Sequence, residues 1–104
     1  MLRQIQLEEL IDCLRRYEGG TSFVHVEATP GAFVRNAAVA IEQAFAAGEG
    51  PYRVGLRLAD DGWIRVEGLT HLTIDEEGRL LLAGHDDKGR LTTALELSRE
   101  RFPA

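Results

Sequence analysis

Three short segments rich in Asp and Gly recur between runs of alternating apolar and polar residues, and this pattern limits the possible folds more than any other feature. The segments are DDG at 60–62, DEEG at 75–78 and DDKG at 86–89. Such segments are typical of tight turns between antiparallel strands. They separate five predicted strands at 52–58, 63–68, 70–74, 79–84 and 91–97. The second half of the chain is therefore predicted to form an antiparallel meander.

The first part of the chain is predicted to hold one helix and one strand. From Ile5 to Glu18, apolar residues recur every three or four positions, as in an amphipathic helix, and two glycines follow directly. Residues 22–28 alternate as a strand does. Cys13 flanks the apolar stripe of the helix, and we interpret it as a packing residue because no basic partner is placed to activate its thiol.

The alanine-rich segment 33–47 fits two structures. Its residues after Asn36 have high helix propensity, and asparagine is a good helix N-cap. The same residues also alternate, as in a strand long enough to need curvature around a sheet. Propensity alone favours the helix.

Composition indicates one soluble domain. A chain of 104 residues with 44% hydrophobic and 28% charged residues suits a single core. Its net charge of −5 argues against nucleic-acid binding, which requires a concentrated basic surface. We find no signal peptide or membrane-spanning run, and only one cysteine. The expected location is the cytoplasm, with no membrane or nucleic-acid partner.

The hairpin at 52–67 has an apolar face and a charged face. One interpretation is that the charged face meets water, and that Arg–Glu pairs across the strands fix their register. The alternative is that the sheet closes into a half barrel, so that this face and residues of strand 22–28 line a cleft for an anionic ligand, with Trp63 as a stacking surface. The candidate ligand-binding residues are His25, Glu27, Arg53, Arg57, Trp63, Arg65, His71 and His85.

Histidines and carboxylates raise the possibility of catalysis. His25, His71 and His85, with Glu27 and Asp86, are residue types that serve metal sites and acid–base chemistry, but their spacing matches no known signature. We therefore assign no catalytic residue, and we expect no metal and no cofactor. The GxSxG, phosphate-loop, HExxH and GxGxxG motifs are missing. A small enzyme, possible only if these side chains converge in a cleft, is the alternative to a binding module.

Four strings in this order, AFVRNA, GPYRVGLRL, DGWIRVEGLTHLTID and GRLLLAGHDDKGRL, resemble the YojF-like family of small proteins from Bacillus-type bacteria. The resemblance covers residues 31–97. It implies a mainly β domain with an N-terminal helix, a strand at 33–47, and no established activity or catalytic residues. Members are often encoded beside a deacetylase of bacillithiol biosynthesis, which associates the family with that thiol pathway. The link at 27–31 is shorter than in the relatives.

These observations predict an α+β, mainly β domain over residues 1–104. Helix 5–18 is expected to pack on a curved antiparallel meander, or partly open barrel, of about seven strands within 22–97. The expected function is a non-catalytic ligand- or partner-binding module, accessory to bacillithiol metabolism, with the pathway deacetylase as a candidate partner. A homodimer is expected, because pairing would cover exposed sheet edges.

Overall fold

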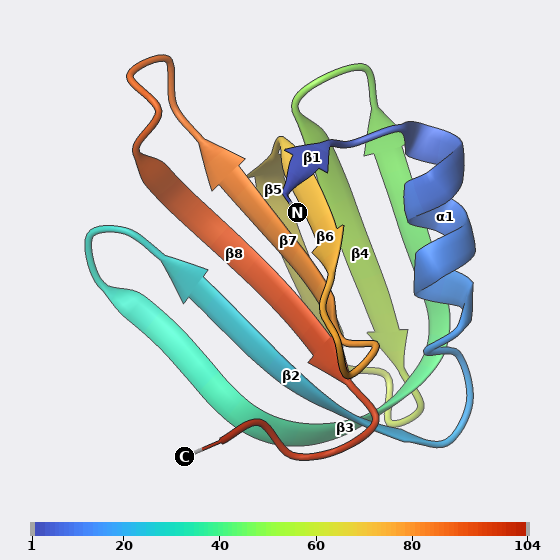
Figure 1. Cartoon of the computed structure of the whole chain (residues 1–104). Coiled ribbons are helices and arrows are strands. Elements are labelled where there is room, and N and C mark those ends of the chain that lie inside the picture. Colours follow the sequence, from blue (N-terminus) through green and yellow to red (C-terminus); the bar gives the residue numbers. More distant parts are fainter. Residues whose placement is uncertain (1, 104) are drawn as a thin grey trace.

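The computed structural model describes residues 2–103, which form one helix and an eight-stranded antiparallel sheet (Figure 1). The elements in chain order are β1 (Arg3–Gln4), α1 (Leu7–Arg15), β2 (Thr21–Ala28), β3 (Ala32–Gly48), β4 (Tyr52–Leu58), β5 (Trp63–Leu69), β6 (His71–Ile74), β7 (Leu80–His85) and β8 (Leu91–Ser98). The predicted mainly β, α+β class is confirmed, and each predicted strand is present within one or two residues.

The sheet is strongly curved but does not close into a barrel. Its strand order is β1-β6-β7-β8-β2-β3-β4-β5, so β1 and β5 are the two edges. The predicted curved antiparallel sheet is confirmed, and it is open rather than closed into a barrel. The five C-terminal strands also do not form one continuous meander, because β5 and β6 are not paired. Gly68, at a φ of 76°, bends the chain near the end of β5, and the amide of Thr70 then donates to the carbonyl oxygen of Ala83 in β7.

Strand β3 joins the two parts of the sheet. Its first part pairs with β2 and its second part with β4, and Figure 1 shows it sweep past β2 and then run behind α1. Two register shifts bend it, one at Asn36, whose φ is 56°, and one between Ile41 and Gln43. The strand prediction for this segment is confirmed. The pairing of β3 with β2 and with β4 outweighs the helix propensity of its residues.

The helix is shorter than predicted at both ends. Ile5 is buried in extended chain before the helix, where its amide donates to the carbonyl oxygen of Thr70. Tyr17 is buried in the turn that follows, before Gly19 and Gly20 with positive φ. Cys13 is buried on the face that packs against the core. Within residues 2–103, no helix is long and apolar enough to cross a membrane.

The buried side chains form one cluster between α1 and the concave face of the sheet. Val54 and Leu56 of β4 and Val66 of β5 point into it, as the alternation predicts, and Ile64 packs at its margin. Each fully buried aliphatic side chain contributes about 1.5–3 kcal/mol relative to exposure. The residues that alternate with these core positions in β4 and β5 therefore lie on the outer face of the sheet.

Candidate functional site

An apolar hollow of about 270 Å³ lies on the outer face of β3, β4 and β5. We call it the Phe45–Trp63 hollow. It is lined by Phe45, Ala46, Ala47, Arg53, Val54, Gly55, Trp63 and Arg65. The hollow thus contains three of the predicted ligand-binding residues.

Strand register builds the floor of this hollow. Phe45, Gly55 and Arg65 are direct neighbours across the three strands. The ring of Trp63 stacks with that of Phe45 at a centroid distance of 5.9 Å. A Cβ at Gly55 would lie 3.6 Å from the Trp63 ring, an ordinary van der Waals distance, so the ring packs directly against this glycine. Trp63 is 58% exposed and Phe45 43% exposed, which makes the stacked pair accessible.

The arginines around the hollow differ in their partners. Arg65 pairs with Glu67 at an Nε–Oε2 distance of 3.3 Å. Arg57 forms an ion pair with Glu42 and is not part of the lining. Within residues 2–103, Arg53 has no ion-pair partner, so its guanidinium is available to a ligand.

His25 lies in a different part of the sheet and is only 7% exposed. Its Nδ1 is 3.2 Å from Nη1 of Arg35, and its Nε2 is 3.2 Å from Oε1 of Glu27. Since a guanidinium only donates, Nδ1 accepts and the Nε2 proton points to the carboxylate. Both ring nitrogens are thus engaged in holding the sheet surface together.

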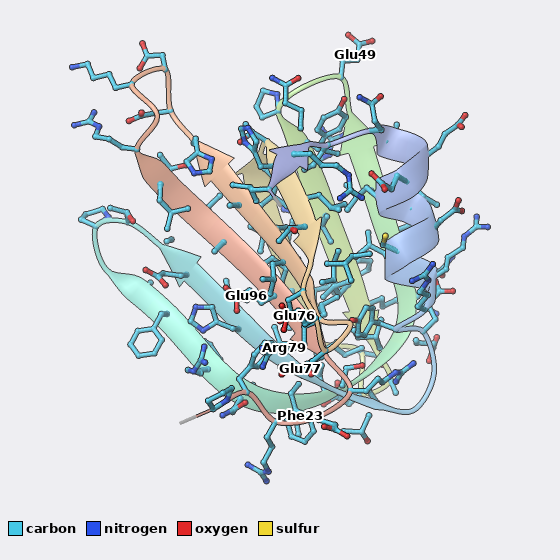
Figure 2. The ribbon with its side chains drawn as sticks, in the orientation of Figure 1. Phe23, Glu49, Glu76, Glu77, Arg79 and Glu96 are labelled. Carbon is cyan, nitrogen blue, oxygen red and sulfur yellow. The ribbon has the colours of Figure 1, made fainter. Side chains whose placement is uncertain are left out.

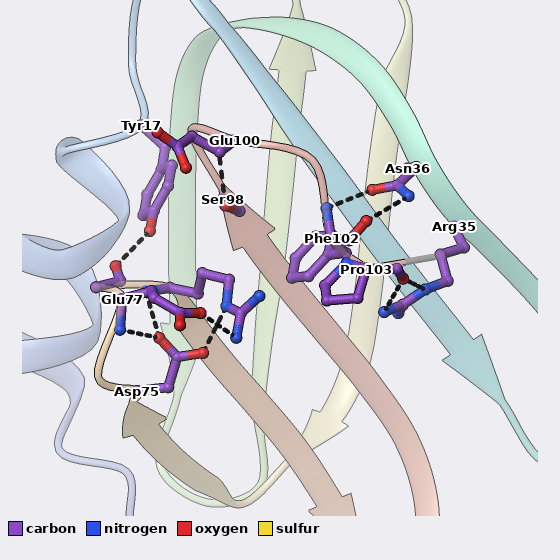
Figure 3. Close-up of polar contacts among 11 residues, drawn as sticks. Tyr17, Arg35, Asn36, Asp75, Glu77, Ser98, Glu100, Phe102 and Pro103 are labelled. Atoms are coloured by element: carbon purple, nitrogen blue, oxygen red, sulfur yellow. Dashed lines mark hydrogen bonds and ion pairs between the residues drawn. The ribbon is translucent and has the colours of Figure 1, made fainter.

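The C-terminal segment covers this region (Figure 3). The Asn36 side chain accepts from the amide of Phe102 at 2.7 Å and donates to its carbonyl oxygen at 2.9 Å. Arg35 donates to the carbonyl oxygen of Pro103 and lies over the Phe102 ring. Arg79 lies over that ring as well. This arrangement is a structural clamp that closes over the bulge in β3.

A second hollow, of about 430 Å³, lies beside the 75–78 turn and contains several arginines. Each of these arginines contacts another part of the fold, and Arg101 lies over the ring of Phe23. Arg79 bonds Asp75, and Arg99 donates to the carbonyl oxygens of Arg16 and Gly19. Burial raises the pKa of Tyr17, whose hydroxyl donates to a turn carbonyl (Figure 3). We assign no ligand to this hollow.

His71 and His85 form a second histidine group. Their Nδ1 atoms are 3.2 Å apart, and the rings meet edge to face with centroids 4.9 Å apart. Oγ1 of Thr70 lies 2.7 Å from Nδ1 of His71. The predicted histidines therefore contribute to two separate groups.

The candidate residues do not share one cleft. Strands β8 and β7 separate the His25 strand from the His71 strand, a distance of about 14 Å across the sheet. His25 lies beside the Asn36 bulge, and about 30 Å of strand β3 separates that bulge from Phe45. His25 and Glu27 therefore do not line the hollow. In the described part of the chain, no group of three or more His, Cys, Asp or Glu residues is placed to hold a metal.

Several residues of these groups were not among the sequence candidates. Phe45 is the main one, and it was missed because its partners across the strands depend on the register of a segment that propensity favoured as helix. The glycine in the middle of β4 was the available signal. It indicated a close approach, although a tryptophan ring and not another backbone lies against it. Asn36, Arg35 and Phe102 carried no signal of the clamp.

The fold and its surface define a small α+β protein built on one curved, open antiparallel sheet. Residues 4–102 match the family described as "Protein of unknown function (DUF1806)", and the chain belongs to this family. It is 40% identical to the uncharacterized protein YojF of Bacillus subtilis (strain 168), with 97% of this chain and 98% of YojF covered.

The crystal structure of Bacillus subtilis YojF has the same fold. It matches with a TM-score of 0.92 at 42% sequence identity, and the match covers 99% of this chain and 98% of that one. The predicted resemblance to the YojF-like family is confirmed. The sequence alignment spans 115 positions, more than the 104 residues of this chain, so the relative carries inserted residues.

Proposed function

We propose that the protein is a non-catalytic binding module whose Phe45–Trp63 hollow takes a ligand with an apolar or aromatic body and an anionic group. The observation that carries this proposal is the exposed aromatic stack bordered by Arg53 and Arg65 on a protein of net charge −5. An aromatic ligand gains from stacking and from burial of the apolar lining. An anionic group gains charge-assisted hydrogen bonds from a guanidinium.

The chemistry of the lining favours binding over catalysis. Its only polar side chains are the arginine guanidiniums and the indole of Trp63. Guanidinium stays protonated, and indole only donates, so neither supplies a general base or a nucleophile. The histidine groups, which carry such chemistry, lie elsewhere.

Trp63 is the chain's single tryptophan, so its fluorescence reports directly on the hollow. We suggest titration with 8-anilinonaphthalene-1-sulfonate, an aromatic anion. Saturable quenching of Trp63 is expected. Arg53→Gln should weaken binding about tenfold, the equivalent of one charge-assisted hydrogen bond. Phe33→Ala, which removes an aromatic that is 69% exposed on another part of the sheet, is the matched control and should bind as the parent does.

The outcome of a second variant decides the proposal. Phe45→Ala removes half of the aromatic stack without touching a charged group. Binding that persists unchanged in Phe45→Ala, or that is lost equally in Phe33→Ala, would contradict the assignment of the hollow.

We also propose, from the family resemblance, that the ligand is an anionic low-molecular-weight thiol of the bacillithiol pathway and that the protein acts in the cytoplasm. Bacillithiol can replace the sulfonate in the same titration. The pathway deacetylase is the proposed protein partner, and co-purification from the native cell tests it. If bacillithiol at millimolar concentration leaves Trp63 fluorescence unchanged and no deacetylase is recovered, the assignment to the bacillithiol pathway fails. The general proposal of a binding module is then judged by the sulfonate titration alone.

The proposed homodimer uses the free edge of β5. Antiparallel pairing of two copies about Val66 would place Arg65 of one copy opposite Glu67 of the other, twice by symmetry. Both side chains are exposed on the described edge, and opposite charges stabilise cross-strand pairs. Light scattering should show a dimer that Arg65→Glu or Glu67→Arg weakens and that the double variant restores. A monomer for the parent chain excludes it.

A further inference from the structure

His71 and His85 face each other at one end of the sheet. His71 pairs with Ala83 in the β6–β7 ladder, and His85 lies two positions further along β7, on the same face. Gln4 of β1 is the direct neighbour of His71 on its other side. The binding hollow and the clamp make no use of these residues.

The two imidazoles have the spacing of metal ligands. A tetrahedral zinc ion bound at 2.0–2.1 Å has ligand nitrogens separated by about 3.3 Å, and the Nδ1–Nδ1 distance here is 3.2 Å. The rings are nearly perpendicular, at 87°, so that both Nδ1 atoms converge without ring stacking. Oγ1 of Thr70 supplies an oxygen 2.7 Å from one of them.

The backbone holds this arrangement rigidly. Oγ1 of Thr70 accepts from the amide of His85 at 3.1 Å, and the Thr70 amide donates to the carbonyl oxygen of Ala83 at 2.9 Å. The three donor atoms thus belong to one hydrogen-bonded unit, and little rearrangement is needed to bind an ion.

Access and charge also favour a cation. His71 and Thr70 line a hollow of about 320 Å³ together with Gln4 and Glu49. Figure 2 shows Glu49 at the turn between β3 and β4, at the opposite end of the molecule from Phe23 of β2. His71 can thus be reached from solvent through this hollow, and an amide oxygen and a carboxylate lie on it as well. His85 is half-buried beside His71 and does not line the hollow.

We propose that His71 and His85 form a binding site for a divalent transition metal of the zinc type, with both Nδ1 atoms as ligands. Each histidine binds the ion through an unprotonated Nδ1 and carries its proton on Nε2, so the ring that held the Nδ1 proton exchanges it through solvent for one on Nε2 and both ligands stay neutral. Solvent and the oxygen of Thr70 or Gln4 complete the coordination. Two protein imidazoles make a reversible site, unlike the closed four-ligand sites of structural zinc. The spacing of the two histidines in the chain gave no indication of this site.

The test is calorimetric titration of the chelator-treated full chain with ZnCl₂ alone in a buffer that does not bind metal. One ion per chain is expected. His71→Ala and His85→Ala should each lower the affinity at least tenfold, since each leaves a single imidazole. His25→Ala is the matched control and should bind as the parent does, because both nitrogens of His25 are already engaged. No binding by the parent, or equal loss in the control, overturns the proposal.

A measurement on the unaltered chain guards against variants that fail to fold. Titration with CoCl₂ should broaden or shift the ring-proton resonances of His71 and His85 together, saturating at one equivalent, and leave those of His25 unchanged. Visible absorption from nitrogen-bound cobalt should rise in parallel. Equal effects on all three histidines, or on none, would refute the site independently of any substitution.

Discussion

Gly84→Ala tests the close approach of β5 to β7. A Cβ at residue 84 would lie 2.1 Å from the carbonyl oxygen of Gly68 and 2.7 Å from Cγ2 of Thr93. The nearest atom is backbone, so no side-chain rotation relieves the contact. Either the bend at Gly68, near the end of β5, or the strand β7 must move by about 1 Å to restore an ordinary van der Waals separation.

The expected cost of this movement is at the upper end of the range for overpacked cores, about 3 kcal/mol. With an unfolding entropy of about 2.1 cal/mol/K per residue, a chain of 104 residues loses about 14 °C in Tm for that change. Urea unfolding followed by far-UV circular dichroism measures the free energy, and differential scanning calorimetry measures the Tm. The slope of the urea transition should stay constant if the native topology is kept.

Gly31→Ala is the matched control. Gly31 lies in the turn between β2 and β3, and a Cβ there meets no atom within 4 Å. The control should lie within about 1 kcal/mol of the parent, with any gain coming from the lower entropy of the unfolded chain. A Gly84→Ala variant within about 0.5 kcal/mol of the parent would show that β5 and β7 do not approach each other as described.

Three further predictions concern the clamp, the last hairpin and the thiol. Asn36→Ala should lower the free energy of unfolding by about 2 kcal/mol in urea titrations, because it removes both hydrogen bonds to Phe102 and places alanine at positive φ. Asn36→Gly also removes the hydrogen bonds but adopts positive φ without strain, so it should cost less. Equal costs for the two variants would contradict the contribution of the backbone conformation. The backbone hydrogen bond from Arg90 is the main reason that the pKa of Asp86 is lowered. The ionised Asp86 carboxylate therefore stabilises the folded state at pH values above its unfolded pKa of about 3.9, and this stabilisation is lost as the pH falls through the lower pKa of the folded state. Asp86→Asn should therefore flatten the acid limb of stability measured by urea midpoints, and an unchanged limb contradicts this. Cys13 is buried, and burial raises the pKa of its thiol. Ellman's reagent at pH 8 should therefore label Cys13 only when the chain unfolds, and urea should accelerate the reaction. Immediate labelling of the native protein would disprove the burial of this thiol.

Local patterns predicted the elements of the second half of the chain closely. The strand at 52–58 was predicted with the bounds of β4, and the turns at 60–62, 75–78 and 86–89 all join antiparallel neighbours or lead into them. Turn residues and two-residue alternation act over a few positions of the chain, so the turns and strands that they specify can be predicted from the sequence. The same alternation placed Trp63 and Arg53 on the outer face.

The segment 33–47 could not be resolved in this way. Its alanines favour a helix, yet β3 pairs with β2 through one half and with β4 through the other. The hydrogen bonds that fix it as a strand come from residues far away in the chain. Propensity differences of less than about 1 kcal/mol per residue do not outweigh those partners.

The sequence by itself determined which residues face the core, where the turns lie and to which family the chain belongs. Only the tertiary structure decided which outward residues meet. The order of the strands places His25 beside Arg35 of the clamp, His71 beside His85, and Trp63 beside Phe45. These groupings depend on the unpaired junction between β5 and β6 and on the two bends of β3, where long-range contacts override the local pattern.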